Sequence, residues 1–250
     1  MTRSSSTNPV QIRNYPGSLL FTGAANNYVD LPYSFDPTAT EFSVLLWVRP
    51  TTMADIHSGT GTAHSYYSQQ DGSGSGRTWM GMGRTGDDNY FESNYGGITQ
   101  HSTYIMLGNV WQHLAITKNS SNLISYYVNG VLSGTNTATI DSANGTHRFG
   151  ASKIGVANMY GYLGPTKIFT RKLSATEILS DYVNGSISDT SNLQALYNFT
   201  DGAGTTLTDT SGNSNHGTIV GSTVTWSTIS PMKSRTIASG RTLSTGRTIA

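Results

Sequence analysis

Short stretches in which apolar residues alternate with polar ones or run together recur along the chain, separated by Gly, Asn and Ser clusters. Alternation over 28–31 indicates a half-buried strand, and the continuous apolar run 42–48 before Pro50 indicates a strand buried on both faces. The stretches 111–118 and 123–130 flank Asn-Ser-Ser-Asn and predict a hairpin. Many short strands at this spacing are typical of a sandwich or jelly roll. Further strands are predicted at 18–22, 160–171, 193–199, 216–220 and 222–226.

One stretch, 174–185, has the spacing of a helix instead. Ser174 and Glu177 form the Ser-x-x-Glu pattern of a capping box, and Gly185 supplies a stop signal. We therefore expect one short surface helix on a sheet. Its predicted apolar stripe consists of Ile178, Leu179, Tyr182 and Val183.

The segment 53–104 is rich in Gly, Ser and Tyr and has weak periodicity, which suits strands with long loops at their tips. Long loops on a rigid scaffold are where recognition usually occurs. Aromatic rings can stack on the apolar faces of sugars, and nearby Asp or Asn can bond the sugar hydroxyls. The segment is therefore a candidate glycan surface, with Trp79 weighed equally as a core residue. The candidate residues are Trp79, Asp87, Asp88, Tyr90 and Tyr95.

The amino-acid composition limits the kinds of site that the chain can form. The 250 residues are 36% hydrophobic and 12% charged, which allows a real core with few charges. The absence of cysteine excludes disulfides, thiolate metal sites and a cysteine nucleophile. No apolar run approaches the roughly 20 residues of a membrane span, and the start lacks the apolar core of a signal peptide. We expect a protein of a virion or an extracellular surface, made without a recognisable signal peptide.

Charge is distributed unevenly along the chain. The formal net charge is +1, of which residues 1–13 contribute +2 and residues 231–250 contribute +4, so residues 14–230 carry −5. Two basic ends therefore flank an acidic body, and such ends suit binding to neighbouring subunits. Nucleic acid is not an expected partner, because the six basic residues have no aromatic residues interleaved in the tail.

The stretch 234–250 repeats Arg-Thr-Ile or Arg-Thr-Leu every six residues. In an extended strand, one face would be made only of small residues. An isolated strand is not stable in water, so we expect this arm to bind an open sheet edge, other copies of itself or an acidic groove. A β-solenoid and a disordered tail are the alternatives. The larger side chains of the other face are Arg235, Ile237, Arg241, Leu243, Arg247 and Ile249.

Five stretches together resemble a known family. They are "SLLFTGAANNYVDLP", "EFSVLLWVRP", "WQHLAITKNSSNLISYYVNGV", "YLGPTKIFTRKLSATEI" and "LYNFTDGAGTTLTDTSGNSNHGTIVG", in that order over about residues 17–226. They resemble the laminin-G-like, concanavalin-A-like jelly-roll domains, including the pentraxin-related branch, in which the first stretch is a hairpin. The resemblance implies an all-β fold, a two-sheet antiparallel jelly-roll sandwich with one short helix. The expected organisation is a basic arm at 1–16, the jelly-roll domain at 17–228 and an extended arm at 229–250.

In relatives, acidic residues of the first hairpin and before the late strand can hold calcium. This chain has Asn26 and Asn27 at the first place, and Gly and Pro at the second. Asp201 and Asp209 do match the closing segment, but Asp also caps its own turns. We favour the turn-capping interpretation; no cofactor is expected to be required, and a structural calcium ion is the alternative.

A retaining glycoside hydrolase needs two carboxyl groups about 5–5.5 Å apart. The chain has three Glu residues, none in a Glu-x-Asp-x-x-Glu motif, and the adjacent Asp87 and Asp88 suit a turn. We therefore expect a non-enzymatic structural and surface-binding subunit of a larger assembly, such as a capsid decoration or fibre component of a virion. Its expected partners are neighbouring subunits, through the arms, and surface glycans. A free glycan-binding lectin, with or without calcium, is the alternative, and a glycoside hydrolase is third.

Overall fold

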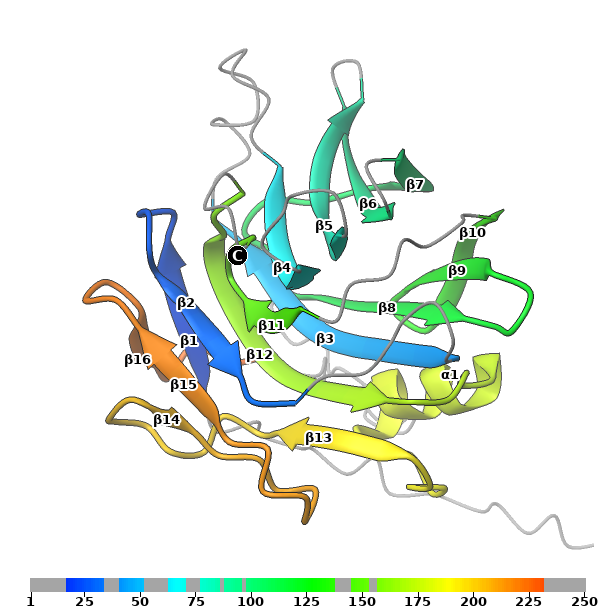
Figure 1. Cartoon of the computed structure of the whole chain (residues 1–250). Coiled ribbons are helices and arrows are strands. Elements are labelled where there is room, and N and C mark those ends of the chain that lie inside the picture. The colour runs from blue at the N-terminus through cyan, green and yellow to red at the C-terminus, as the bar shows by residue number, and fades with distance from the viewer. Residues whose placement is uncertain are drawn as a thin grey trace, which may run out of the picture.

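The structure, a computed structural model, describes residues 17–33, 41–51, 63–70, 77–85, 88–95, 98–137, 145–152 and 157–231. Within these ranges the chain forms sixteen strands and one helix (Figure 1). The strands make two antiparallel sheets that pack as a sandwich. This confirms the predicted all-β jelly roll. The arm at 1–16 and the tail from 232 onward lie outside the described residues, and so do all six of the arm residues named above.

Sheet A is built around the long strands β3 (Phe42–Pro50) and β12 (Tyr160–Phe169). Strand β12 pairs with β1 through residues 160–163 and with β13 through residues 166–169. The predicted hairpin at 111–130 is confirmed as β8 and β9. The strand order is β10 (Val131–Thr137), β9 (Leu123–Val128), β8 (Gln112–Lys118), β3, β12, β1 (Ser18–Thr22) and β16 (Thr225–Ser227), with β13 (Leu193–Tyr197) beside β12.

Sheet B contains the described strands of the loop-rich segment 53–104. Its last four strands are consecutive in sequence and adjacent in space, so they form a meander. In Figure 1 this end of the sheet lies far from β14 and β15. The strand order is β14 (Thr206–Leu207), β15 (Gly217–Val220), β2 (Tyr28–Leu31), β11 (Thr146–Phe149), β4 (His64–Gln70), β5 (Arg77–Thr85), β6 (Asp88–Tyr95) and β7 (Ile98–Ile105).

The first two strands do not form the hairpin that the family resemblance implied. Strand β1 belongs to sheet A and β2 to sheet B. The connection turns at Asn26, whose φ is 61°. The side chain of Asn27 donates to the carbonyls of Ala24 and Ala25 and accepts from the amide of Thr223. These bonds hold the chain as it passes from one sheet to the other.

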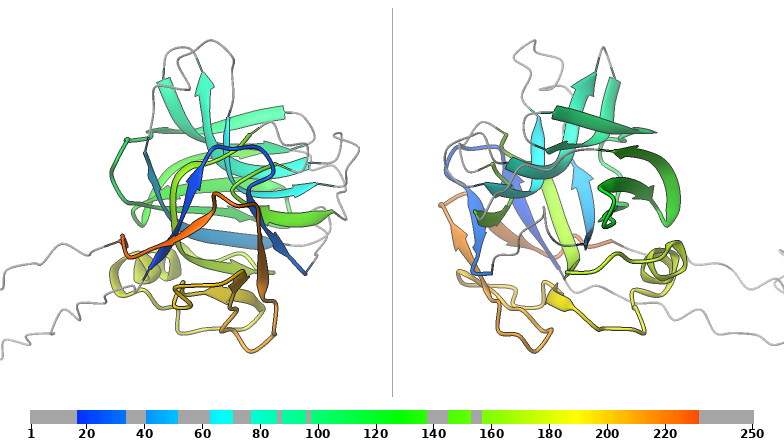
Figure 2. Two further views of the ribbon diagram at one scale, coloured as in Figure 1. Left: turned by 90° about the vertical axis from the view of Figure 1, so that its left-hand side faces the viewer. Right: turned by 45° about the vertical axis from the view of Figure 1, so that its right-hand side comes forward.

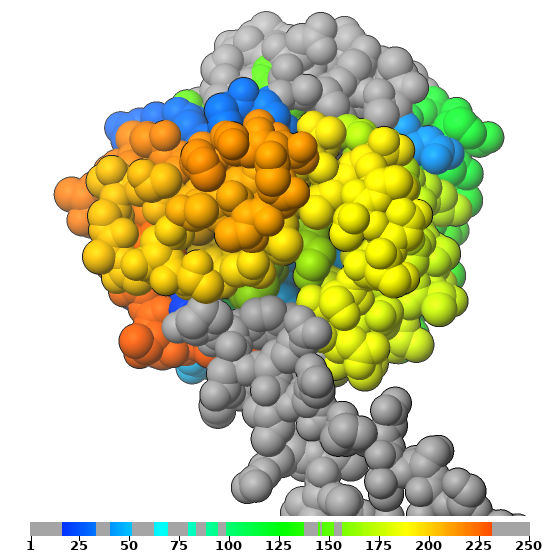
Figure 3. All heavy atoms as spheres, turned by 90° about the horizontal axis from the view of Figure 1, so that it is seen from below, coloured from blue at the N-terminus to red at the C-terminus, as the bar shows by residue number. Residues whose placement is uncertain are grey.

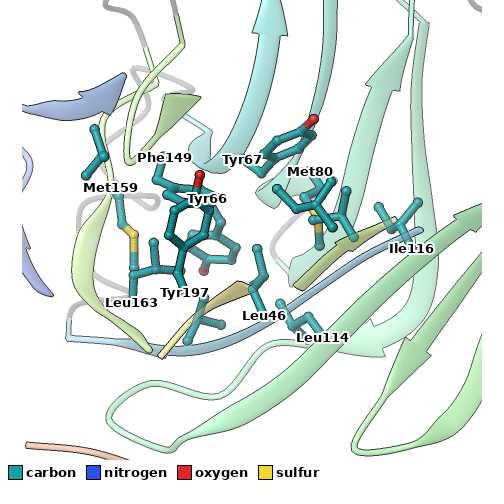
Figure 4. Packing of buried hydrophobic residues seen from close by; sticks show 14 of the residues in the cluster. Leu46, Tyr66, Tyr67, Met80, Leu114, Ile116, Phe149, Met159, Leu163 and Tyr197 are labelled. Carbon is teal, nitrogen blue, oxygen red and sulfur yellow. The ribbon is translucent and has the colours of Figure 1, made fainter. Parts of the chain in front are cut away.

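The core lies between the sheets, where alternate residues of each strand meet (Figure 4). On β3, Leu46 and its neighbours two positions away enter this core, while Leu45 belongs to a second cluster on the outer face. The apolar run 42–48 is continuous because both of its faces are covered, as predicted. Labelled core residues in Figure 4 include Leu46, Leu114, Ile116 and Leu163 from sheet A, and Tyr66, Tyr67, Met80 and Phe149 from sheet B.

Helix α1 (Ala175–Asn184) covers one end of the outer face of sheet A. The capping box is confirmed, since the Ser174 hydroxyl accepts from the Glu177 amide and the Glu177 carboxylate accepts from the Ser174 amide. Gly185 ends the helix with a φ of 67°, a left-handed conformation that favours glycine. Ile178 packs into the outer cluster with Leu45 and Phe169.

The predicted apolar stripe of α1 is wrong at two positions. Leu179 and Val183 are 45% and 50% exposed, whereas Asp181 is 3% exposed. Asp181 is buried because two groups of sheet A bond its carboxylate. Lys167 Nζ lies 2.5 Å from Oδ1, and His113 Nε2 lies 3.1 Å from Oδ2. A polar contact therefore fixes one side of the helix.

In both views of Figure 2, α1 lies toward the bottom of the molecule and β5 to β7 lie at the top, with β10 in contact with both α1 and β7. Seen from below, the segments from α1 to β15 form one continuous surface (Figure 3). No helix within the described residues has the length and apolarity needed to cross a membrane.

Candidate functional site

The outer face of sheet B can be read from the register of β5 and β6. Met80 and Met82 of β5 are core residues, and they pair with Ser93 and Phe91 of β6. Ser93 bonds the hydroxyl of Tyr126 across the core at 2.7 Å. Successive strand residues point to opposite faces. Tyr90, Glu92 and Asn94 therefore lie on the outer face.

Strand β7 adds two exposed residues to this face. His101 pairs with Glu92, and Thr99 pairs with Asn94. The Asn94 amide donates to the Thr99 hydroxyl at 3.0 Å. The rings of Tyr90 and His101 lie together, with centroids 4.7 Å apart. We call this group the Glu92 surface: Tyr90, Glu92, Asn94, Thr99 and His101.

Glycines on β5 make room for the Glu92 side chain. Gly81 pairs with Glu92, and Gly83 pairs with Tyr90. A Cβ atom at Gly83 would lie 1.5 Å from Glu92 Oε1 and 1.8 Å from its carboxyl carbon. The carboxyl group therefore lies flat over β5, in space that any larger residue at 83 would occupy.

The Glu92 carboxyl is buried against β5. The residue is 3% exposed, and Oε2 is buried without a hydrogen-bond partner in the described part of the chain. Burial raises its pKa from 4.5 to about 7. Near neutral pH a large fraction of the molecules therefore carry a neutral carboxyl, which donates one hydrogen bond and still accepts others.

The sequence-predicted residues are distributed along β5 and β6. Tyr90 belongs to the Glu92 surface, and Trp79 pairs with Asn94 in the backbone ladder. Asp88 opens β6 opposite Thr85, and Tyr95 closes it opposite Thr78. Asp87 lies outside the described residues. Register thus brings Tyr90 and Trp79 to neighbouring strands and puts Asp88 and Tyr95 at the two ends of β6.

Four residues of the surface were not predicted: Glu92, Asn94, Thr99 and His101. Glu92 lies two positions after Tyr90, so strand alternation alone could have placed both on one face. Its neighbours Gly81 and Gly83 were a second available signal. His101 could not be placed in advance, because its position depends on the β6–β7 register, which shifts between Tyr90 and Glu92.

A second polar group lies on the same outer face at β2 and β11. Arg148 Nε donates to Asp30 Oδ1 at 2.6 Å, and the guanidinium lies 3.8 Å from the centre of the Tyr28 ring. Strands β2 and β6 are four steps apart in the sheet, or roughly 19 Å. Asp30 and Glu92 are therefore too far apart for the carboxyl pair of a glycosidase, which spans about 5–9.5 Å.

The carboxylates of the two candidate metal residues accept hydrogen bonds from other residues of the closing segments. The Asp209 carboxylate accepts from the amides of Leu196, Ser211 and Asn215, and Asp201 accepts from the amide and hydroxyl of Thr208. These bonds give both carboxylates the turn-capping role that the sequence favoured. Among the described residues, no three His, Cys, Asp or Glu side chains are grouped as metal ligands would be. A structural calcium ion stays the untested alternative.

Comparison with solved structures supports the fold. A candidate carbohydrate-binding protein from Bacteroides ovatus matches with a TM-score of 0.65 and 18% identity, covering 94% of this chain and 67% of its own. A heptameric SAP-like pentraxin from Limulus polyphemus matches with a TM-score of 0.53 and 12% identity, covering 69% of this chain and 84% of its own. The binding domain of Paraclostridial Mosquitocidal Protein 1 matches with a TM-score of 0.50 and 16% identity, covering 70% of this chain and 45% of its own. At these identities the likeness shows the fold alone.

Comparison with families is more specific. No curated protein matches the sequence. The family model of the concanavalin A-like lectin/glucanases superfamily matches residues 22–179, more than half of the chain. This agrees with the two antiparallel sheets and with the resemblance seen in the sequence. The chain belongs to the concanavalin A-like lectin/glucanases superfamily.

Proposed function

We propose that the protein binds carbohydrate at the Glu92 surface and does not hydrolyse it. The observation that carries this proposal is a partly exposed ring pair beside a buried, readily protonated carboxyl group on the outer face of sheet B. Tyr90 is half-buried and His101 is exposed, so part of each ring can contact a ligand. A sugar has an apolar ring face and several hydroxyl groups, and it needs both kinds of contact.

Each member of the surface has a distinct role in this proposal. The rings of Tyr90 and His101 support the apolar face of a pyranose. The exposed Thr99 hydroxyl, which accepts from the buried Asn94 amide, offers a further hydrogen bond at the edge. The buried Glu92 carboxyl lies beneath them, in the space left by Gly83. The pairing of β5 with β6 and of β6 with β7 holds the group rigidly, which reduces the entropic cost of binding.

The spacing of the described carboxyl groups on this face supports binding without hydrolysis. Glycoside hydrolysis needs an acid and a second carboxylate at a short, fixed separation. Glu92 supplies one carboxyl with a raised pKa, as a general acid requires, but Asp30 is roughly 19 Å away by strand spacing. The candidate carbohydrate-binding protein from Bacteroides ovatus has the same fold, which supports a binding role.

A glycan array followed by calorimetry tests the proposal. We expect a glycan that binds the full chain, with affinity reduced at least tenfold by Tyr90→Ala and by His101→Ala. Tyr182→Ala, at a half-buried tyrosine of α1, is the matched control and should bind normally. Binding that survives Tyr90→Ala would contradict the assignment of the surface. Repeating the titration with a chelator tests for calcium.

We further propose that the protein works as a structural subunit of a larger assembly, such as a capsid decoration or fibre component at a virion or other extracellular surface. This proposal is supported by the basic ends, the acidic body and the six-residue repeat. Neighbouring subunits would bind the arm through Arg235, Ile237, Arg241, Leu243, Arg247 and Ile249. A free lectin is the alternative.

Solution mass separates the two roles. Light scattering of the full chain should show an oligomer, and a chain ending at Ser230 should be a folded monomer. If both are monomers, self-association through the tail is excluded. Glycan binding at the Glu92 surface is independent of this result.

A further inference from the structure

A groove of about 540 Å³ lies on the side of the sandwich away from the Glu92 surface. Arg49 and Tyr162 pair on the outer face of sheet A, beyond the end that α1 covers. The turn before β8 forms one wall, and the segment after β16 forms the other. We call it the Arg49 groove; its lining is Arg49, Asn109, Val110, Trp111, Thr228, Ile229 and Ser230.

The floor of the groove is aromatic. The Arg49 guanidinium carbon lies 5.5 Å from the centre of the Tyr162 ring, and the Trp111 ring lies 6.3 Å from the same ring. Gly164 admits the indole, because a Cβ there would lie only 3.3 Å from Trp111 Cζ3. The absence of a side chain at 164 therefore lets Trp111 lie close to the sheet.

Hydrogen bonds hold both walls. The buried Gln112 side chain donates to the carbonyls of Leu107 and Val110 and accepts from the Leu107 amide, which fixes the turn. On the other wall, the Ser18 hydroxyl donates to the Ile229 carbonyl at 2.5 Å. The groove is thus formed before any ligand arrives. Its volume lies in the range of about 300–1,000 Å³ typical of small-molecule sites.

The charge and the exposed apolar side chains of the groove indicate which kind of ligand it can bind. Arg49 is the charged residue of the lining. Its Nε donates to the Asn109 carbonyl at 3.1 Å, and its terminal nitrogens have no hydrogen-bond or ion-pair partner among the described residues. Val110 and Ile229 are 47% and 39% exposed beside it. A guanidinium held by one bond and an aromatic ring is prepared for a bidentate carboxylate.

We propose that the Arg49 groove is a second ligand site, which binds an acidic saccharide. The sugar carboxylate bonds the terminal nitrogens of Arg49, and the sugar ring contacts Trp111 and Val110. The hydroxyls of Thr228 and Ser230 and the amide of Asn109 surround the groove with partners for sugar hydroxyls. The site does not depend on the Glu92 surface, since the two lie on the outer faces of different sheets.

Calorimetry with trigalacturonate, a trisaccharide with three carboxylates, tests the proposal on the full chain. We expect saturable binding that Arg49→Gln weakens at least tenfold and Trp111→Ala weakens severalfold, with Arg49→Lys intermediate. Tyr90→Ala should leave it unchanged, which distinguishes this site from the proposed glycan surface. Binding that is unaffected by Arg49→Gln, or lost in Tyr90→Ala, would overturn the proposal.

A ligand-side control removes any dependence on the folding of the variants. The methyl ester of trigalacturonate keeps the rings and loses the charges, so it should not bind the unaltered protein. Added salt should weaken binding of the acid, because an ion pair is screened. Equal affinity for the ester and the acid, or no binding of the acid at millimolar concentration, would show that the groove is not an acidic-saccharide site.

Discussion

Replacing Asp181 with Asn should destabilise the fold strongly. The substitution keeps the shape of the side chain but removes the charge that Lys167 Nζ and His113 Nε2 contact at 2.5 and 3.1 Å. Lys167 is itself 8% exposed, so its ammonium group would be left buried without a counter-charge. Breaking one partner of a buried pair costs about 3–5 kcal/mol. A domain of this size loses about 2–4 °C in Tm per kcal/mol, so Tm should fall by roughly 6–20 °C.

The pH dependence provides a second signature. Burial alone would raise the pKa of Asp181, but the charge of Lys167 and the hydrogen bond from His113 outweigh it and lower that pKa well below its usual value. A carboxyl with a depressed folded pKa contributes stability above the unfolded pKa, about 3.8, and loses it as the pH falls through the folded pKa. The unaltered protein should therefore lose this contribution below about pH 4.

Thermal unfolding followed by circular dichroism at pH 3 and pH 7 measures both effects. Asp181→Asn should differ from the unaltered protein strongly at pH 7 and less at pH 3. The matched control is Asp201→Asn, which changes an exposed carboxylate and keeps an acceptor for the Thr208 amide. It should change stability by less than about 1 kcal/mol. A loss below about 1 kcal/mol for Asp181→Asn, or an equal loss at both pH values, would refute the reasoning.

Three further predictions concern β5, β6 and the helix cap. The folded pKa of Glu92 is raised from 4.5 to about 7, so its stabilising contribution is fully present below pH 4.5 and is lost as the pH rises through 7. In denaturant titrations at pH 8, Glu92→Gln should therefore be more stable than the unaltered protein by up to about 3 kcal/mol. At pH 4.5 the two proteins should be nearly equal in stability. Gly83→Ala should cost about 1–3 kcal/mol, since its Cβ would meet the Glu92 carboxyl, and adding Glu92→Ala should recover part of the loss; no recovery would contradict this packing. Ser174→Ala should cost about 1 kcal/mol through loss of the helix cap, and an unchanged Tm would contradict it.

Much of the fold could be predicted from the sequence, because its signals are local. Alternation and apolar runs located β1, β2 and β3, and the capping box located α1. Such local signals do not show which of the two sheets a strand belongs to. The stretch containing β1 and β2 looks like a hairpin, but the side chain of Asn27 bonds backbone groups that carry the chain across to the other sheet.

The misread side of α1 has a similar cause. Leu179 and Val183 have the spacing of a buried stripe, yet Asp181 is buried instead. Its partners Lys167 and His113 are 14 and 68 positions away and belong to sheet A. Helix periodicity contains no information about them. A buried polar residue is stable only where such partners meet, and those meetings depend on tertiary structure.

Only part of the candidate site could be predicted, because the rest depends on contacts between strands. The composition of 53–104 pointed to a recognition surface, and Tyr90 belongs to the surface that the structure forms. Glu92 was not chosen, because its burial and raised pKa arise from the strand pairing that lays it over Gly83. The ring pair of Tyr90 and His101 likewise exists only once β6 and β7 are in register.

The most direct test of carbohydrate binding at the Glu92 surface is an NMR titration of the full chain with the glycan selected by the array. Binding at this surface should produce its largest amide shifts on residues 90–94 of β6 and 99–101 of β7, and the amides of α1 should stay unchanged. Shifts concentrated elsewhere, with β6 and β7 unaffected, would contradict it.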